Sequence, residues 1–387
     1  MARRMSRLGT ETAFDVLARA QRMREEGKPV INLGIGSPDF RTSEDIVEAG
    51  IDALHDGYHF YTPAKGLPEV RAAVAEDIRA RHGVLADPER VLIVPGGKPT
   101  MFFAILMLGE PGIEIMYPDP GFPIYRSMIE FSGATPVPIE LHEETGFGFD
   151  SGEVLAKITD ATRLIILNSP ANPTGGVVAR DQIDSLVAGL DDHPETYVLS
   201  DEIYSRIVYD DLDHVSLLTY ESLRDRLIVL DGWSKTYSMT GWRLGWGLWP
   251  PSLIDGAERL QINSTSCASA PVQMAGLAAL TGRQDHVSDM VTAFDERRRF
   301  VHDGLNRISG FRCVLPKGAF YVFPNITGTG LTSQQVETRL LEEASVAVVS
   351  GTSFGRLGEG YIRLSYAASM DELREAIERI GALFGTR

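Results

Sequence analysis

The sequence is poor in cysteine and carries no grouped metal ligands. Its two cysteines, Cys267 and Cys313, lie far apart without CxxC spacing. We therefore expect free thiols in a reducing compartment and no disulfide framework. The eight histidines are scattered, without an HExxH motif or a Cys/His cluster, so no metal site is expected.

Basic charge is also scarce, since 37 lysines and arginines face 53 aspartates and glutamates, for a formal net charge of -16. Such an acidic chain is not expected to bind nucleic acid or an anionic membrane surface. No apolar run reaches membrane-spanning length, and the basic start at Arg3, Arg4 and Arg7 is not followed by the apolar segment of a signal peptide. We expect a cytoplasmic protein without membrane contact.

Short apolar runs alternate with helical patterns from about residue 45 to residue 280. This alternation predicts an α/β fold with a mostly parallel central sheet covered by helices on both faces. The pattern changes in the last hundred residues, which we assign with the N-terminal segment to a smaller α+β domain. The expected division is 1–44 for the N-terminal part of the small domain, 45–283 for the large domain and 284–387 for the rest of the small domain.

Three of the apolar runs are followed by polar residues suited to chemistry. The runs at 164–167, 197–199 and 227–230 lead to Asn172, Asp201 and Lys235, respectively. Open parallel sheets bind ligands at the carboxyl ends of their strands. We therefore expect these three side chains to meet at one edge of the sheet.

Lys235 stands in a segment rich in small residues, with Arg243 eight positions later. A lysine taken alone is most often a surface charge. Here Gly232, Ser234 and Gly241 allow other groups to approach the backbone closely. A desolvated lysine can lose its proton and act as a nucleophilic amine in Schiff-base chemistry, and an arginine nearby suits a phosphate.

A second feature is the run at 91–94 followed by Gly96, Gly97, Lys98 and Pro99, and then by an apolar helix predicted over 101–108. A strand, a glycine turn and a helix start form an anion site through free N–H groups and the helix dipole. Pro99 supplies no N–H, so Gly97 and Lys98 must provide the donors. The spacing of a Walker phosphate loop is missing, and the glycines at 34–36 do not complete a dinucleotide fingerprint.

The order of these elements is highly specific: Asn-Pro-x-Gly, then Asp-x-x-Tyr, then Ser-Lys with an arginine eight residues on. Over nearly its whole length the chain resembles the class I/II aminotransferases, pyridoxal-phosphate (PLP) enzymes of fold type I. The resemblance implies that Lys235 carries PLP and that Asp201 pairs with the pyridine nitrogen. A carboxylate there keeps this nitrogen protonated, so that the ring accepts electrons from the substrate Cα while Lys235 moves the proton.

The resemblance also implies how the rest of the cofactor is held. Asn172 and Tyr204 match residues that hydrogen-bond its phenolic oxygen, although taken alone they would be a turn asparagine and a half-buried tyrosine. Phe122 matches the aromatic residue that stacks on the ring, where ordinary core packing is the alternative. The phosphate is assigned to Gly97, Lys98, Ser234 and Arg243 of one subunit and to Tyr61 of the other subunit of a homodimer with a shared active site.

For the substrate, the resemblance implies contacts from Gly36, Asn172 and Arg363. An arginine can fork onto an α-carboxylate, and Arg363 stands in an apolar strand pattern where an unpaired charge would be unfavourable. An ungapped comparison places Ala13 and Leu106 where some acidic-substrate relatives have side chains that engage a distal carboxylate. In addition, Trp233, just before Ser234, is larger than the residue usual at this position of the family signature. We therefore hypothesise a neutral or aromatic amino donor and 2-oxoglutarate as acceptor.

The predicted activity is ping-pong transamination between an L-amino acid and a 2-oxo acid. Two alternatives share the same residues. One is a PLP-dependent lyase that eliminates at the β carbon and cleaves a C–S bond, and the other is a PLP-binding protein with a regulatory or interaction role.

Overall fold

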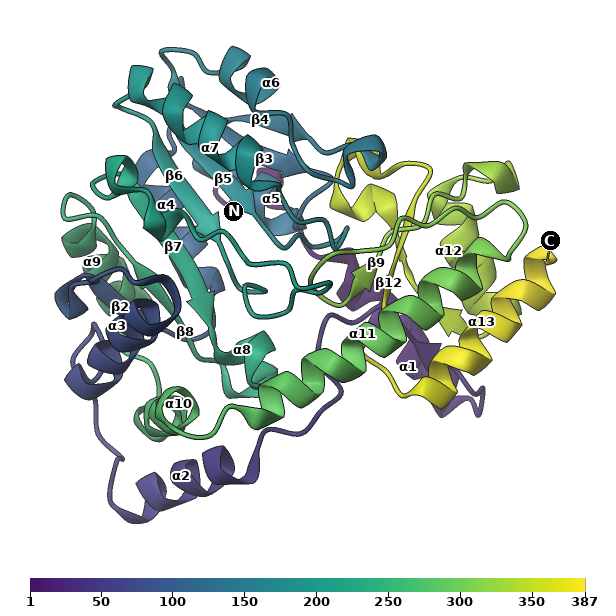
Figure 1. Cartoon of the computed structure of the whole chain (residues 1–387), viewed down its shortest axis with the longest axis horizontal. Helices are drawn as coiled ribbons and strands as arrows, with labels where there is room; N and C mark the ends of the chain where they lie inside the picture. Colours follow the sequence, from purple (N-terminus) through teal and green to yellow (C-terminus); the bar gives the residue numbers. More distant parts are fainter. Residues whose placement is uncertain (387) are drawn as a thin grey trace.

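The computed structural model describes residues 1–386 and places a seven-stranded sheet at the centre of the large domain (Figure 1). The strand order is β2-β8-β7-β6-β5-β3-β4, and β8 runs antiparallel to both of its neighbours while the other pairs are parallel. The prediction of a mostly parallel sheet is confirmed. Its strands are β2 (Val91–Val94), β3 (Glu114–Asp119), β4 (Thr135–Glu140), β5 (Thr162–Asn168), β6 (Tyr197–Asp201), β7 (Leu227–Gly232) and β8 (Gly245–Leu248).

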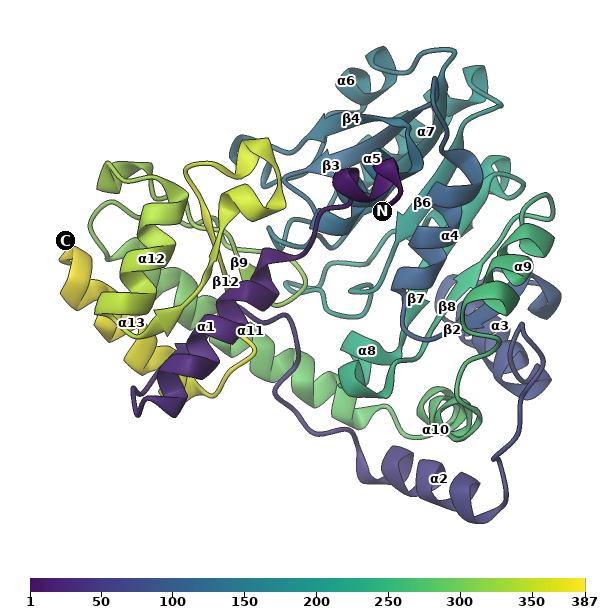
Figure 2. The same cartoon turned by 180° about the vertical axis from the view of Figure 1, so that it is seen from behind.

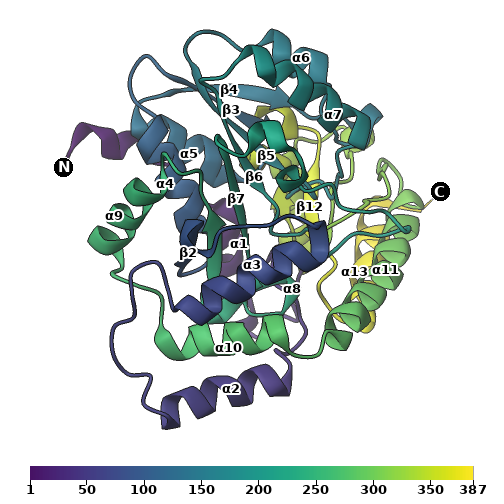
Figure 3. The same ribbon diagram turned by 60° about the vertical axis from the view of Figure 1, so that its left-hand side comes forward.

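Helices cover both faces of this sheet because consecutive strand residues point to opposite sides. In β6, for example, Val198 belongs to one buried apolar cluster and Leu199 to the other. One face packs against α4 (Lys98–Leu108), α5 (Pro123–Ser132) and α9 (Ile254–Ser264). The other packs against α3 (Pro68–His82), α6 (Ser151–Ala156), α7 (Arg180–Gly189) and α10 (Ala270–Thr281), and Figure 3 shows α2 (Glu44–His55) lying outside α10.

The small domain combines the two ends of the chain. Strand β1 (Ile31–Asn32) pairs in parallel with β10 (Val346–Ala347), while β11 (Val349–Ser350), β12 (Ile362–Ser365) and β9 (Tyr321–Val322) form an antiparallel sheet. Its helices are α1 (Thr12–Glu25), α11 (Asp285–Asn306), α12 (Ser333–Glu343) and α13 (Met370–Phe384). Viewed from behind, the N-terminal segment crosses from α5 in the large domain to α1 in the small domain (Figure 2).

Two local details differ from the sequence expectation. Helix α4 begins at Lys98, three residues before the predicted start, because Pro99 fits the first turn of a helix. The apolar run 346–349 is divided between β10 and β11, which pair with different strands. The division at residues 44 and 283 stays a prediction, and α11 extends from the large domain to the small domain (Figure 1). Within residues 1–386, no helix has both the length and the apolar character needed to cross a membrane.

Candidate active site

A cavity of about 510 Å³ lies at the carboxyl ends of β5, β6 and β7. These strands are neighbours with Asn168 opposite Asp201 and Asp201 opposite Leu230, so their ends meet at one edge. The large domain supplies the floor, while α1, β11 and β12 of the small domain supply further walls. Of the predicted site residues, all but Tyr61 line this cavity: Gly36, Gly97, Lys98, Phe122, Asn172, Asp201, Tyr204, Ser234, Lys235, Arg243 and Arg363.

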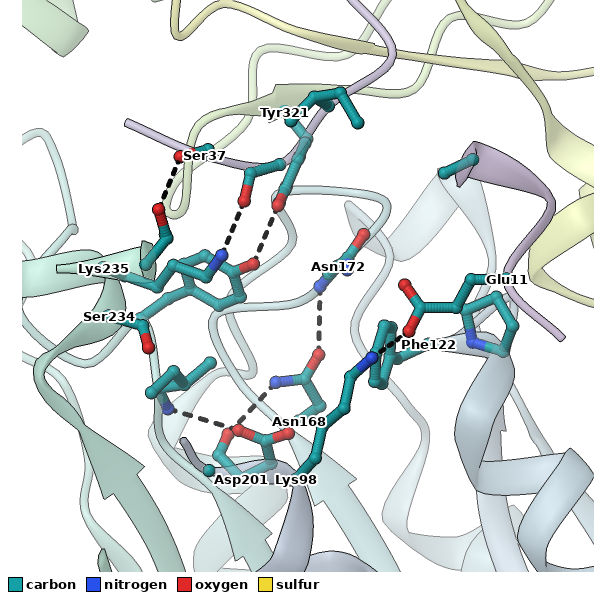
Figure 4. A pocket seen from close by; sticks show the side chains of 18 of the residues that line it. Glu11, Ser37, Lys98, Phe122, Asn168, Asn172, Asp201, Ser234, Lys235 and Tyr321 are labelled. Atoms are coloured by element: carbon teal, nitrogen blue, oxygen red, sulfur yellow. Dashed lines mark hydrogen bonds and ion pairs between the residues drawn. The ribbon is translucent and has the colours of Figure 1, made fainter. Parts of the chain in front are cut away.

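Lys235 lies in the short helix α8 (Trp233–Thr236), directly after β7, and its side chain points into the cavity (Figure 4). Its Nζ donates a hydrogen bond of 2.6 Å to the carbonyl oxygen of Gly36. Burial, and then the positive charges of Arg363 and Arg243, lower the pKa of Lys235 to about 8. A useful fraction of the amine is therefore unprotonated near neutral pH, as nucleophilic attack on a carbonyl requires.

Asp201 ends β6 and is held by hydrogen bonds to its carboxylate. Tyr125 Oη donates to Asp201 Oδ2 at 2.6 Å, and the backbone N–H of Ile203 donates to Oδ1 at 3.3 Å. Asn168 Nδ2 donates to the backbone carbonyl of Asp201 at 3.1 Å. Burial raises the pKa of Asp201 to about 6, and the hydrogen bond from Tyr125 opposes this rise. The carboxylate is thus ionised at neutral pH and can pair with a cationic ring nitrogen.

Arg363 is a buried cation on the opposite wall. Its Nη1 donates to Asn172 Oδ1 at 2.9 Å and its Nη2 to the carbonyl oxygen of Gly34 at 2.5 Å. Its guanidinium lies 4.7 Å from the ring centres of both Tyr321 and Phe354. Its Nε is buried without a hydrogen-bond partner, and within residues 1–386 the hydrogen-bond partners of its guanidinium are an amide and a carbonyl oxygen, both uncharged. Because a buried unpaired charge is unfavourable, the geometry favours an anionic ligand here.

Gly36 and Tyr204 both neighbour the amine of Lys235: Gly36 accepts its hydrogen bond, and the ring centre of Tyr204 lies 5.9 Å from Nζ. Tyr204 Oη is 2.8 Å from Tyr321 Oη, and burial raises the pKa of Tyr204 well above its usual value. A Cβ on Gly36 would lie 2.1 Å from Tyr321 Oη, so only glycine leaves room for this hydroxyl. Tyr204 thus neighbours the amine and Tyr321 neighbours the guanidinium, and their linked hydroxyls can hydrogen-bond a ligand.

The start of α4 and Arg243 form a second anion-binding corner. Gly96 has a φ of +83°, and a Cβ at this position would lie 2.1 Å from Arg243 Nη2. Arg243 itself has a φ of 57°, and its Nη1 donates to the carbonyl oxygen of Thr240 at 2.9 Å. The buried Ser234 lines the cavity close by. A helix start, a guanidinium and a hydroxyl together suit a phosphate.

Phe122 lies in the cavity, with its ring centre 5.7 Å from that of Tyr125 in an edge-to-face contact. Tyr61 instead lies outside the cavity and is 87% exposed. One chain therefore does not bring Tyr61 to its own site, and its predicted role depends on a second subunit.

Sequence reasoning missed several cavity residues: Glu11, Tyr125, Tyr321 and Phe354. They belong to segments whose relation to the site depends on tertiary packing, and no spacing pattern connects them to Lys235. Leu106 and Trp233, which the sequence analysis placed next to the substrate or beside Ser234, do not line the cavity. Leu106 packs against the apolar cluster between α4 and the sheet, and Trp233 is buried with its Nε1 donating to Gly276 O at 2.9 Å.

The fold and this cavity define an enzyme in which a buried amine, a carboxylate and two anion-binding corners surround one reaction centre. Comparison with known proteins agrees: the model for aminotransferase class I and II matches residues 28–380. The chain belongs to this family and is a PLP-dependent aminotransferase of fold type I, as predicted. The lyase and regulatory alternatives are not favoured by these comparisons.

Individual relatives match over almost their full length. An aspartate aminotransferase of Pyrococcus horikoshii is 39% identical, over 95% of this chain and 92% of the relative. One of Rhizobium meliloti is 37% identical, over 98% and 95%. Among solved structures, the Rhizobium meliloti aspartate aminotransferase has a TM-score of 0.94 at 36% identity, with 99% of this chain and 98% of the other covered. An aromatic aminotransferase of Pyrococcus horikoshii has a TM-score of 0.88 at 37% identity, covering 94% and 98%.

Proposed function

We propose that the cavity binds PLP and that the enzyme transfers the amino group of a neutral or aromatic L-amino acid to 2-oxoglutarate by a ping-pong mechanism. The observation that carries the cofactor assignment is the buried amine of Lys235 in the same cavity as the anion-binding corner at Arg243. The residues present fit the group, because the cavity offers a nucleophilic amine, an ionised carboxylate and a separate anion corner.

Each of these residues has a distinct task in the proposal. Gly97, Lys98, Ser234 and Arg243 would hold the phosphate, Asp201 would hold a proton on the pyridine nitrogen, and Asn172 and Tyr204 would hydrogen-bond the phenolic oxygen. When bound, PLP supplies an electron sink for the substrate Cα. Arg363 would fix the α-carboxylate, with Gly36 on its other side, and Phe122 would stack on the ring.

Proton transfer falls to Lys235 in this scheme. With a pKa of about 8, its free amine would accept the proton from the substrate Cα and donate it to the C4′ carbon of the bound cofactor at near-neutral pH. The cavity lining includes Phe14, Ile35, Val349 and Phe354, which suits an apolar donor side chain.

The second candidate is aspartate as donor, the substrate in the names of several relatives. One observation favours it: the cation of Lys98 lines the cavity and could meet a distal carboxylate. Half-reactions of the purified holoenzyme distinguish the two candidate donors. Each L-amino acid is added alone, and conversion of the cofactor is followed by its absorbance. Phenylalanine, tyrosine or a neutral aliphatic donor should convert it, and 2-oxoglutarate should reverse the change. Conversion by aspartate alone would overturn the proposed donor class.

We further propose a cytoplasmic homodimer in which Tyr61 reaches the phosphate site of the partner subunit. Phe60 and Tyr61 are 83% and 87% exposed, and such exposed aromatic side chains suit an interface. A mixture of Tyr61→Ala and Lys235→Ala subunits tests this, because one site of each mixed dimer would then contain both native residues. Activity recovered on mixing supports the shared site, and no recovery in verified mixed dimers counts against it.

A further inference from the structure

Glu11 directs a carboxylate into the cavity from the edge of the small domain. It occupies the N-cap position of α1, but its side chain makes no capping hydrogen bond. It forms an ion pair with Lys98 at the start of α4 instead (Figure 4). The Glu11 side chain is 14% exposed and that of Lys98 is 46% exposed, so the carboxylate is the more deeply placed partner.

The segment that carries Glu11 is fastened on both sides of this ion pair. The backbone N–H of Gly9 donates to Ser127 Oγ in α5 at 2.9 Å. Thr12 Oγ1 donates to Ser353 Oγ at 2.5 Å, in the short helix Gly351–Phe354 next to β11. These contacts hold Glu11 over the cavity between the two domains.

The other charged groups of the cavity have different partners. Arg363 donates to Asn172 and Gly34, and Arg243 lies at the phosphate corner. Burial, and then Arg363 and Arg243, lower the pKa of Lys235, and the carboxylate of Glu11 opposes them. Glu11 therefore acts electrostatically on the reaction centre, and it is also the direct counter-ion of Lys98.

We propose that Glu11 is a specificity-determining residue that competes with the distal carboxylate of a dicarboxylic substrate for Lys98. With a neutral or aromatic substrate, Glu11 stays paired with Lys98, and the cavity presents no free charge to the side chain. With 2-oxoglutarate, Lys98 exchanges Glu11 for the distal carboxylate. This inference rests on the proposed function, because a ping-pong enzyme with these two substrates must accept both kinds in one cavity.

The partial exposure of the ion pair between Glu11 and Lys98 and the flexibility of the lysine side chain permit this exchange. Lysine is a flexible point charge whose donors can turn to a new acceptor, and the Lys98 side chain is nearly half exposed. Partly exposed ion pairs contribute little, so an incoming carboxylate can replace Glu11 at small cost. The distal carboxylate of the substrate then replaces the contact that Lys98 loses with Glu11.

The test measures binding, independently of turnover. Maleate, a dicarboxylate without an amino group, and 3-phenylpropionate, an apolar monocarboxylate, are titrated by calorimetry into the holoenzyme of wild type, Glu11→Gln, Lys98→Met and Glu11→Gln/Lys98→Met. Glu140→Gln is the matched control, since Glu140 forms a lysine pair with Lys157 at 3.6 Å and does not line the cavity. Glu11→Gln should tighten maleate binding by roughly fivefold, without a gain for 3-phenylpropionate.

In the Lys98→Met background, Glu11→Gln should give no such gain, because the competition requires the lysine. Equal or weaker maleate binding in the folded Glu11→Gln holoenzyme would overturn the proposal, as would an equal gain for both ligands. The half-reactions with single amino acids test the proposed donor class separately. Maleate binding decides the role of Glu11 even if aspartate proves to be the donor.

Discussion

The lowered pKa of Lys235 predicts how the stability of the cofactor-free protein depends on pH. In the unfolded chain the amine keeps its proton up to its usual pKa of 10.5, whereas in the folded protein it releases the proton near its pKa of about 8. Between these values the unfolded chain binds more protons, so the free energy of unfolding rises with pH. Below about pH 8 the folded protein bears the full cost of a buried charge.

The size of this effect follows from the two pKa values. The difference between 10.5 and about 8 corresponds to about 3 kcal/mol. Lys235→Met removes the charge and keeps a side chain of similar length. The lost hydrogen bond to Gly36 O adds a cost that is nearly independent of pH. The stability of wild type relative to Lys235→Met should therefore increase by up to about 3 kcal/mol from pH 8 to about pH 10.5.

Urea denaturation of both apoproteins at matched concentration, repeated across this pH range, measures the difference. Lys157→Met, at a lysine with a 34% exposed side chain, is the control for removal of a lysine charge. A difference between wild type and Lys235→Met that stays constant with pH would refute the argument that burial destabilises the charged amine. Lys235→Met should also lose transamination, because no amine remains to take up the cofactor.

Two further predictions concern the proposed PLP site. Tyr125→Phe removes the 2.6 Å hydrogen bond to Asp201, which should raise the Asp201 pKa further above about 6 and weaken PLP binding to the apoprotein at pH 7 by about tenfold. Spectrophotometric titration should show a smaller loss at pH 9, where the carboxylate is ionised, and unchanged affinity at pH 7 would contradict this role. Gly96→Ala places a Cβ 2.1 Å from Arg243 Nη2 and should weaken PLP binding by at least about tenfold. Gly27→Ala has a similar φ of +86° without a neighbour within 4 Å, so an equal loss of PLP affinity in this control would point to backbone strain alone.

The position of Leu106 in the structure differs from the one that the sequence comparison assigned to it. The hypothesis of a neutral or aromatic donor used Leu106 as a site position, but this residue packs in the core beside α4. The apolar lining of the cavity supports that donor class, and the ion pair between Glu11 and Lys98 neutralises a cation that could otherwise meet a distal carboxylate. Glu11 and Lys98 are 87 residues apart, and no local pattern predicts such a pair.

The sequence alone determined the main architecture and the chemical class of the protein. Apolar runs of strand length that alternate with helical patterns require a covered, mostly parallel sheet, because both faces of each strand must be buried. Asn172, Asp201 and Lys235 follow three of these runs, and parallel strands bring their carboxyl ends to one edge. This local regularity made those positions predictable.

Only the tertiary structure decided which groups surround these side chains. Tyr125 hydrogen-bonds Asp201, Tyr321 meets Tyr204, and Glu11 pairs with Lys98, each across many residues of sequence. Such contacts depend on how α5, β9 and α1 pack around the cavity, since a side chain has no sequence signal for a partner on a distant element. The perturbed pKa values of Lys235 and Asp201 have the same origin, because burial and neighbouring charges arise only after the chain has folded.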